Sequence, residues 1–254
     1  MRLLKQFLYG FFYFSIFFGS LYIVFLLTFP PSPADQRLEE IRALSPLITL
    51  QTVFFINQAE GTIDLGAEIR NPNFDWGVRR FDYHFILKDA AEVELSRASG
   101  SNFILPGETR WVILPGGGRA FPLVPLPRDG IVSVVGFEIQ PINPNSWQRA
   151  RPFGADVSVI TKNLRYEEAT RPRVGTELRG EVENRSSFSL GEVEINGVIF
   201  GPGNRVLAVG RTLTRGLGPG ESRAFTIHWP NQLPVGAVRW EAWGHANFLM
   251  MTRE

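Results

Sequence analysis

Side chains suited to catalysis are sparse in this sequence of 254 residues. Its three histidines are His84, His228 and His245. None of them has the His-x-x-x-His or Glu-x-x-His spacing that places two metal ligands on one helix face. A Gly-x-Ser-x-Gly elbow, which would expose a serine nucleophile, does not occur either. The sequence therefore predicts no catalytic residue, no metal site and no cofactor site, and an enzyme is only the third interpretation of its function.

The sequence also gives no indication of a phosphate-binding loop, a calcium site or thiol chemistry. Glycines cluster at residues 115–118 and 201–204, but no helical pattern follows either cluster, so neither predicts a phosphate cradle. The carboxylates of Asp64, Glu68 and Asp75 lack the spacing of a calcium loop. The sequence contains no cysteine, which excludes disulfides, thiolate catalysis and cysteine metal sites.

The charge of the chain gives no indication of nucleic-acid binding. Lysine and arginine total 26 and aspartate and glutamate total 25, for a net charge of +1. Setting aside Arg2 and Lys5, which precede an apolar segment, leaves 24 basic residues against 25 acidic ones. A domain this close to neutral lacks the basic surface that attracts phosphate backbones.

Residues 7–29 predict a transmembrane helix. This stretch of 23 residues has no charged side chain and would be about 35 Å long as a helix, enough to cross a hydrocarbon core of about 30 Å. Arg2 and Lys5 place the N-terminus in the cytoplasm and the remaining chain outside it. A cleaved signal peptide is the alternative, but its apolar region usually spans about 7–15 residues. A pseudopilin-like N-terminus is a third option, although no charge occurs early in the apolar run.

Residues 32–46 are predicted to form a short amphipathic helix or spacer. Ser32 can cap this helix, Pro33 fits its first position, and Asp35 can complete a capping box. We expect the helix to end near Pro46, where the hydrophobic pattern changes to a period of two residues.

Two segments after this point resemble each other. Residues 65–71 (LGAEIRN) correspond to residues 178–184 (LRGEVEN), and the Pro-Gly-Glu of residues 106–108 returns at residues 219–221. Both matches have an offset of 113 positions (184 − 71 and 219 − 106). Several matches in the same order indicate a tandem duplication.

Each copy has about 100 residues and six or seven short alternating segments separated by Gly, Pro and Asn, as expected of an antiparallel Ig-like β-sandwich. One of the shorter strands is expected at residues 92–97. The predicted fold class is all-β, with two tandem sandwiches after one transmembrane helix. The predicted divisions are 1–31 (cytoplasmic stub and transmembrane helix), 32–46 (spacer), 47–143 (first sandwich), 144–155 (polar linker) and 156–254 (second sandwich).

Residues 85–89 (FILKD) resemble the Phe-x-Leu-Tyr-Asp hallmark of FxLYD domains, with Lys88 at the tyrosine position. The Asn-Pro-Asn of residues 71–73 and the Pro-Gly-Glu of residues 106–108 are similar to that family and to late-embryogenesis-abundant type 2 sandwiches. The second copy departs further, with Asn-Arg-Ser at residues 184–186. The whole layout also resembles single-pass bacterial envelope proteins. This resemblance implies a fold and an envelope location, and it implies no reaction.

Turn and strand chemistry explains most of residues 70–89 without a ligand. Alternation places Phe81, Tyr83, Phe85 and Leu87 on the core face. The side chains left for a partner surface come from the opposite face and from two tryptophans, a residue type common at binding hot spots but more often buried in a sandwich. They are Trp76, Arg80, Asp82, His84 and Trp147.

These features favour a non-enzymatic, membrane-anchored scaffold of the cell envelope. Such a protein would contact the lipid bilayer through residues 7–29 and bind an envelope protein through sandwich loops or an open sheet edge. The alternative is a module that binds lipid or glycan, with lipid held in an apolar slot between the sheets.

Overall fold

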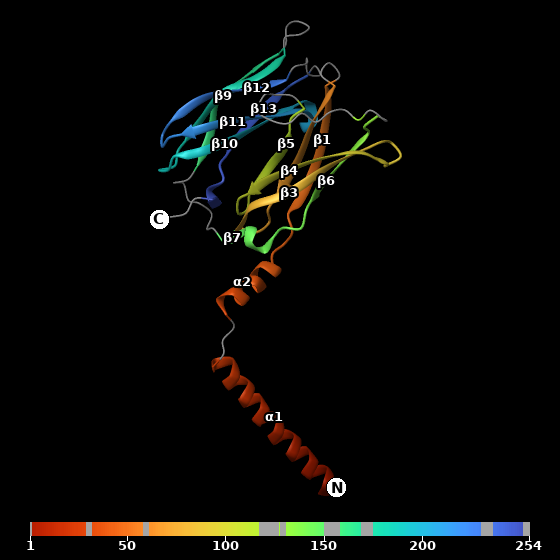
Figure 1. Ribbon diagram of the computed structural model, residues 1–254, viewed down its shortest axis with the longest axis vertical. Coiled ribbons are helices and arrows are strands. Elements are labelled where there is room, and N and C mark those ends of the chain that lie inside the picture. The colour runs from red at the N-terminus through yellow and green to blue at the C-terminus, as the bar shows by residue number, and fades with distance from the viewer. Residues whose placement is uncertain are drawn as a thin grey trace. The chain divides into compact units, whose positions relative to one another are not determined.

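The computed structural model describes residues 2–28, 32–57, 61–116, 127, 131–149, 158–168, 175–229 and 236–250. The chain divides into two compact units, Met1–Leu44 and Ser45–Glu254. The first unit contains two helices and the second contains antiparallel strands (Figure 1). The predicted all-β class, with antiparallel sandwiches and an N-terminal helix, is confirmed.

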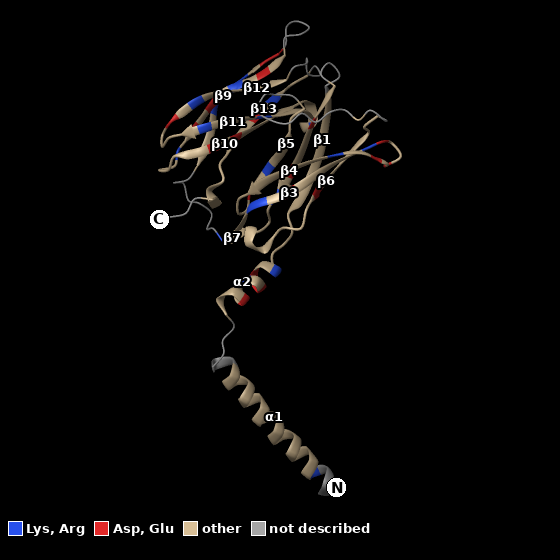
Figure 2. Ribbon diagram, viewed as in Figure 1, with Lys and Arg blue, Asp and Glu red and all other residues tan. Residues whose placement is uncertain are grey.

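Helix α1, Arg2–Thr28, contains the segment predicted to cross a membrane. By length and composition, its residues Lys5–Phe25 are apolar enough to do so. Among the described side chains of α1, Lys5 is the only charged one, and Figure 2 shows the helix tan along most of its length. Phe29, the last residue of the predicted span, lies outside the described residues.

Helix α2, Pro33–Arg42, begins as predicted. The Ser32 hydroxyl oxygen accepts a hydrogen bond from the backbone N–H of Asp35 at 3.1 Å, and the same hydroxyl donates to the Asp35 carboxylate at 2.7 Å. Pro33 occupies the first turn, where a missing N–H costs nothing. The helix ends at Arg42, four residues before Pro46.

The described residues of the first copy form seven strands in two antiparallel sheets. One sheet has the order β1-β2-β5, and the other has the order β4-β3-β6, with β7 paired to β3. The strands are β1 (Ile48–Asn57), β2 (Thr62–Arg70), β3 (Trp76–Lys88), β4 (Glu94–Ile104), β5 (Thr109–Leu114), β6 (Val134–Ile139) and β7 (Trp147–Arg149).

The second copy repeats this topology. Its sheets have the orders β12-β9-β8 and β11-β10-β13, so each strand from β8 to β13 corresponds in turn to one from β1 to β6. The strands are β8 (Val159–Glu167), β9 (Thr176–Asn184), β10 (Leu190–Phe200), β11 (Val206–Leu217), β12 (Ser222–Trp229) and β13 (Arg239–His245). Short 3₁₀ turns lie at Pro144–Ser146, Pro202–Asn204 and Phe248–Met250.

One buried asparagine holds the same turn in each copy. The side-chain N–H groups of Asn71 donate to the carbonyls of Trp76 and Leu105, at 2.6 and 3.0 Å. Those of Asn184 donate to the carbonyls of Phe188, Leu217 and Gly218 at 2.7, 3.1 and 3.0 Å. Both side chains are fully buried, so the repeated Asn is a structural residue that satisfies backbone groups of the turn.

The Pro-Gly-Glu turns also agree between the copies. Gly107 and Gly220 have φ of +65° and +69°, as the third position of a type II turn requires. The carboxylates of Glu108 and Glu221 each accept a backbone N–H at 2.7 Å, from Leu105 and Gly218. The Pro-Gly-Glu segment of each copy therefore forms a type II turn in which the Glu side chain bonds a backbone N–H.

The two copies pack sheet against sheet. The sheet β1-β2-β5 faces its own partner sheet on one side and the sheet β11-β10-β13 on the other, where Gly66 leaves room for Val53 and Val209. This contact is apolar at its centre. It contains Val53 and Phe55 of β1, Trp111 and Ile113 of β5, Val198 and Phe200 of β10, Val206 and Val209 of β11, and Trp243 of β13.

Two boundaries differ from the sequence prediction. Residues 144–149, assigned to the linker, belong to the first copy, because Trp147 is buried and pairs with Val78. A strand of three residues is too short to show a period of two. Strand β4 extends to Ile104 instead of ending at Arg97, because the Ser-Gly-Ser of residues 99–101 forms strand pairs with β3 and no turn. Linker residues 150–155 lie outside the described residues.

Candidate functional site

Three of the predicted surface residues lie together on the outer side of β3. Arg80 and Asp82 are exposed and form an ion pair at 3.3 Å. The Nδ1 atom of His84 lies 2.7 Å from the Ser99 hydroxyl of β4. These groups are therefore held by their own neighbours on an open sheet face.

The two predicted tryptophans lie elsewhere. Trp76 and Trp147 are only 7% and 6% exposed, at the junction of β3 and β7. Burial of this kind leaves little ring surface for a partner, and it agrees with the core role that tryptophan commonly has in a sandwich.

A β-bulge in β3 separates Arg79 and Arg80 from the regular alternation. Val78 pairs with Ile104 and Phe81 pairs with Asn102, so β3 has one residue more than β4 across this interval. Both arginines consequently lie exposed in succession, while Phe81 points into the core. A strict period of two predicts the faces after Phe81 correctly, but it does not show the bulge.

The backbone groups along the outer edge of β4 point away from β3. The Asp82 carbonyl accepts the N–H of Gln140 at 2.9 Å, on the β6 side of β3. Asp82 is opposite Ser101, so the N–H and C=O of Ser101 face outward, and alternation gives the same direction to Ser99 and Arg97. Among the described residues no strand pairs with this edge.

Other sandwich edges are covered by side chains that donate to edge carbonyls. The pairs are Thr52 to Val135, Thr161 to Ala242, Trp229 to Val209, and Arg223 to Arg215 and Gly216. On β4, the hydrogen bond of this kind among the described residues is the one that the Arg110 side chain donates to the Phe103 carbonyl at 3.1 Å. On β4, therefore, a side chain covers the edge only at Phe103, near the end of the strand. The stretch from Arg97 to Ser101 remains an open edge.

A buried ion pair joins the copies beside this edge. The Arg110 guanidinium of β5 donates to the Glu194 carboxylate of β10 at 2.8 Å, and Arg211 of β11 approaches the second oxygen of that carboxylate at 3.3 Å. Asn196 adds a hydrogen bond to Glu194 at 2.9 Å. Burial disfavours the charged carboxylate, but the two arginines outweigh it and hold the pKa of Glu194 below its ordinary value.

A second polar contact between the copies uses the Pro-Gly-Glu turn. His245, at the end of β13, places its Nδ1 atom 2.8 Å from the free oxygen of Glu108. Burial disfavours the charged form of Glu108, but Arg110, the His245 bond and the Leu105 N–H together hold its pKa below the ordinary value. The equivalent Glu221 bonds Arg223 of its own copy, so this use of the turn is specific to the first copy.

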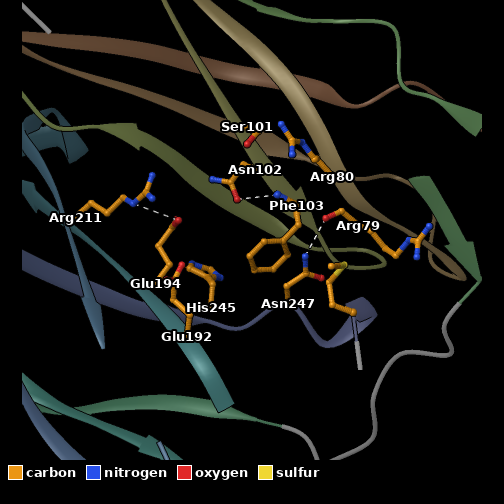
Figure 3. Close-up of a pocket in the computed structure, with 11 residues that line it drawn as sticks. Arg79, Arg80, Ser101, Asn102, Phe103, Glu192, Glu194, Arg211, His245 and Asn247 are labelled. Atoms are coloured by element: carbon orange, nitrogen blue, oxygen red, sulfur yellow. Dashed lines mark hydrogen bonds and ion pairs between the residues drawn. The ribbon is translucent and has the colours of Figure 1, made fainter. Parts of the chain in front are cut away.

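A cavity of about 310 Å³ lies at this junction (Figure 3). Strands β3 and β4 form one wall, through Arg79, Arg80 and residues 101–103. Strands β10, β11 and β13 form the other, through Glu194, Arg211 and His245, together with the segment after β13. The cavity is at the lower end of the size range of about 300–1,000 Å³ that is typical of ligand sites.

Of the predicted surface residues, only Arg80 lines the cavity. The other lining residues come from strands of both copies, so their meeting depends on how the copies pack and not on a local motif. The described residues contain no cluster of three His, Asp or Glu side chains that could hold a metal ion.

No protein-family model and no curated protein matches this chain, so the resemblance to FxLYD-type domains stays a prediction. Among solved structures, the transglutaminase of red sea bream is similar at 12% sequence identity, with a TM-score of 0.21. The match covers 86% of this chain and 32% of the transglutaminase, so the chain spans about a third of that protein. At this TM-score the similarity carries no argument about fold or activity.

Proposed function

We propose that this chain is a membrane-anchored, non-enzymatic binding protein of the cell envelope, and that a partner protein adds an extended strand to the edge of β4. The single observation that carries the proposal is the open edge itself. Its outward N–H and C=O groups at Arg97, Ser99 and Ser101 have no partner strand within the described residues. An edge of this kind is the usual template for strand addition.

The side chains along this edge suit a close approach by another backbone. Residues 98–101 are Ala, Ser, Gly and Ser, all small. Arg97 is held by Glu94 at 3.0 Å and lies on the outer face of the sheet. A strand added here would meet no large apolar group, so its affinity would come mainly from main-chain hydrogen bonds.

The lipid-slot alternative has less support from the packing of the first copy. The ring of Tyr83 lies 5.7 Å from that of Phe85 and 5.3 Å from that of Phe137, and Phe85 lies 4.9 Å from Phe137. Tyr83 and Phe85 are almost fully buried. These rings fill the space between the sheets that an acyl chain would need.

Substitution at Ser99 tests strand addition. Ser99→Pro removes an outward N–H and blocks a new strand, and it leaves the bonds to β3 because they come from the neighbouring residues. A photoreactive amino acid at position 97 should cross-link one specific protein in intact membranes, and Ser99→Pro should abolish that cross-link.

The control is Ser99→Ala, which also removes the hydroxyl that contacts His84 but keeps the N–H. It should retain the cross-link. Equal cross-linking by both variants would rule out binding through the β4 edge. A cross-link to a second copy of this chain would identify the partner as self.

The orientation of the anchor is tested separately. We expect the N-terminus inside, because Arg2 and Lys5 precede the apolar helix. The chain has no cysteine, so a single introduced cysteine reports without background. Ser133→Cys should react with a membrane-impermeant maleimide in intact cells, and Gln6→Cys should react only after lysis. The reverse pattern would contradict the proposed location.

A further inference from the structure

The cavity between the copies contains unsatisfied hydrogen-bonding groups. Four buried polar atoms of its lining side chains make no hydrogen bond among the described residues. One of them, Nε of Arg211, has the Glu194 carboxylate at 3.3 Å as an ion-pair partner. The other three are Nδ2 of Asn102, Nε2 of His245 and Oδ1 of Asn247. Asn102 is 7% exposed and the His245 side chain is 10% exposed. Buried polar atoms of folded proteins nearly always have a partner, so these three indicate a missing one.

The direction of each group follows from the bonds already made. The Asn102 carbonyl oxygen accepts the N–H of Phe103 at 2.8 Å, which leaves its amide N–H groups as free donors. The Asn247 amide nitrogen donates to the Arg79 carbonyl at 2.9 Å, which leaves its oxygen as a free acceptor. His245 Nδ1 faces the Glu108 carboxylate, which leaves Nε2 as the ring atom available to a further partner. The missing partner must both donate and accept.

The charged groups of the wall already have partners. Glu194 is paired with Arg110 and Arg211, and Glu192 approaches Arg215 at 3.5 Å. Two other bonds hold the arginines of the bulge: Arg80 to Asp82, and Arg79 to the Asn145 carbonyl at 2.8 Å. The cavity consequently does not require a charged ligand.

Phe103 supplies an apolar surface in the same space. Its ring lies between His245 and Asn247 in Figure 3. The Arg110 guanidinium lies over one face of this ring, with its central carbon 4.3 Å from the ring centre. Phe103 also lines the cavity, and an aromatic ring can contact C–H groups.

We propose that this cavity binds a neutral saccharide unit. Hydroxyl groups both donate and accept, so they match Asn102, Asn247 and His245 together, whereas a carboxylate or an ammonium ion would match only part of this set. The C–H face of a sugar ring suits Phe103. A neutral peptide amide also donates and accepts, but it has fewer such groups for the same volume.

Binding should be measured on the full chain in lipid nanodiscs, because glycoside detergents carry sugar headgroups. The probes are N-acetylglucosamine, its β-1,4-linked disaccharide, maltose, and the neutral tripeptide Gly-Asn-Gly as the competing class. Saturation-transfer NMR and calorimetry should detect at least one saccharide and not the tripeptide. Binding of no saccharide, or of the tripeptide equally well, would overturn the proposal.

Two variants remove the unpaired atoms and keep the existing bonds. Asn102→Asp retains the acceptor for the Phe103 N–H and loses the free donor. His245→Asn retains a donor near Glu108 and loses Nε2. Each should weaken saccharide binding by about tenfold or more, the effect of losing one hydrogen bond of about 1.4 kcal/mol.

Matched controls lie outside the cavity. Asn204→Asp makes the same charge change beside Arg239, and His228→Asn removes the exposed histidine that approaches Glu177. Both should bind normally, and thermal unfolding should confirm that all four variants fold. Unchanged affinity in folded Asn102→Asp and His245→Asn would overturn the assignment.

A measurement on the unmodified chain guards against variants that fail to fold. A diazirine derivative of the bound saccharide should label peptides that contain residues 101–103 or 245–250, and labelling confined to other peptides would overturn the site. Ser99→Pro should leave saccharide binding unchanged, so failure of this proposal and failure of strand addition are distinguishable.

Discussion

Arg110 and Glu194 belong to different copies of the duplicated fold and form an ion pair of 2.8 Å, with the Arg110 side chain fully buried and Glu194 nine-tenths buried. The pair lies next to the apolar contact between Trp111 and Val198. Residues 45–254 consequently form one compact unit in which the copies share a buried surface.

Removal of the carboxylate should cost more than removal of one arginine. Glu194→Gln leaves Arg110 and Arg211 without their anion, and breaking a buried pair in this way lowers the free energy of unfolding by about 3–5 kcal/mol. Arg110→Met should cost less, because Arg211 and Asn196 still contact Glu194. Denaturant unfolding of both variants measures the order. The control Asp82→Asn, in an exposed pair, should change stability little.

Acid should weaken the junction between the copies. The pKa values of Glu108 and Glu194 are lower in the folded chain than their ordinary value of about 4.3. A depressed folded pKa stabilises the fold above the unfolded pKa, and this stabilisation is lost as the pH falls through the folded value. Thermal unfolding between pH 7 and pH 2 should therefore show a fall in Tm that begins at about pH 4.3.

Glu194→Gln checks the source of this fall. The variant should have a lower Tm at pH 7 and a smaller further loss on acidification, since its amide does not titrate. A variant that loses as much Tm as the parent chain over the same interval would show that the acid sensitivity arises elsewhere.

The sequence predicted local features well and the junction poorly. The Ser32 cap of α2 and the core face of Phe81 and Tyr83 follow from chemistry and alternation within a few residues. Alternation also shows that Glu194 and Asn196 share a face of their strand, but it cannot show that another sheet covers this face. The cavity has the same difficulty, since its walls come from strands more than 80 residues apart.

The repeated asparagines should be among the most sensitive positions of the fold. Asn184→Ala leaves three carbonyls and the N–H of Ser186 without their partner, and each buried group left unsatisfied costs about 1–3 kcal/mol. Asn71→Ala should be destabilising for the same reason. Denaturant unfolding gives the values, and Asn145→Ala, at an exposed position with an ordinary backbone conformation, is the control. Equal stability of Asn184→Ala and the control would contradict the structural role.

The buried ring of Tyr83 gives a test of the pairing between β3 and β4. Tyr83 lies directly opposite Gly100, and a Cβ atom at position 100 would overlap the Tyr83 hydroxyl oxygen and lie 2.6 Å from its ring. The Tyr83 side chain is almost fully buried, and this burial raises the pKa of its hydroxyl. The ring therefore cannot move aside without leaving the core.

Gly100→Ala should lower the free energy of unfolding by about 1–3 kcal/mol, the usual cost of overpacking. Gly136 is the matched control, because it lies opposite Ile86 on the other side of β3 and a Cβ atom there has its nearest neighbour at 3.7 Å. Gly136→Ala should be close to neutral in the same denaturant experiment. Similar losses for the two variants would indicate a general dependence of strand stability on glycine, whereas a loss confined to Gly100→Ala would locate the constraint at the Tyr83 ring.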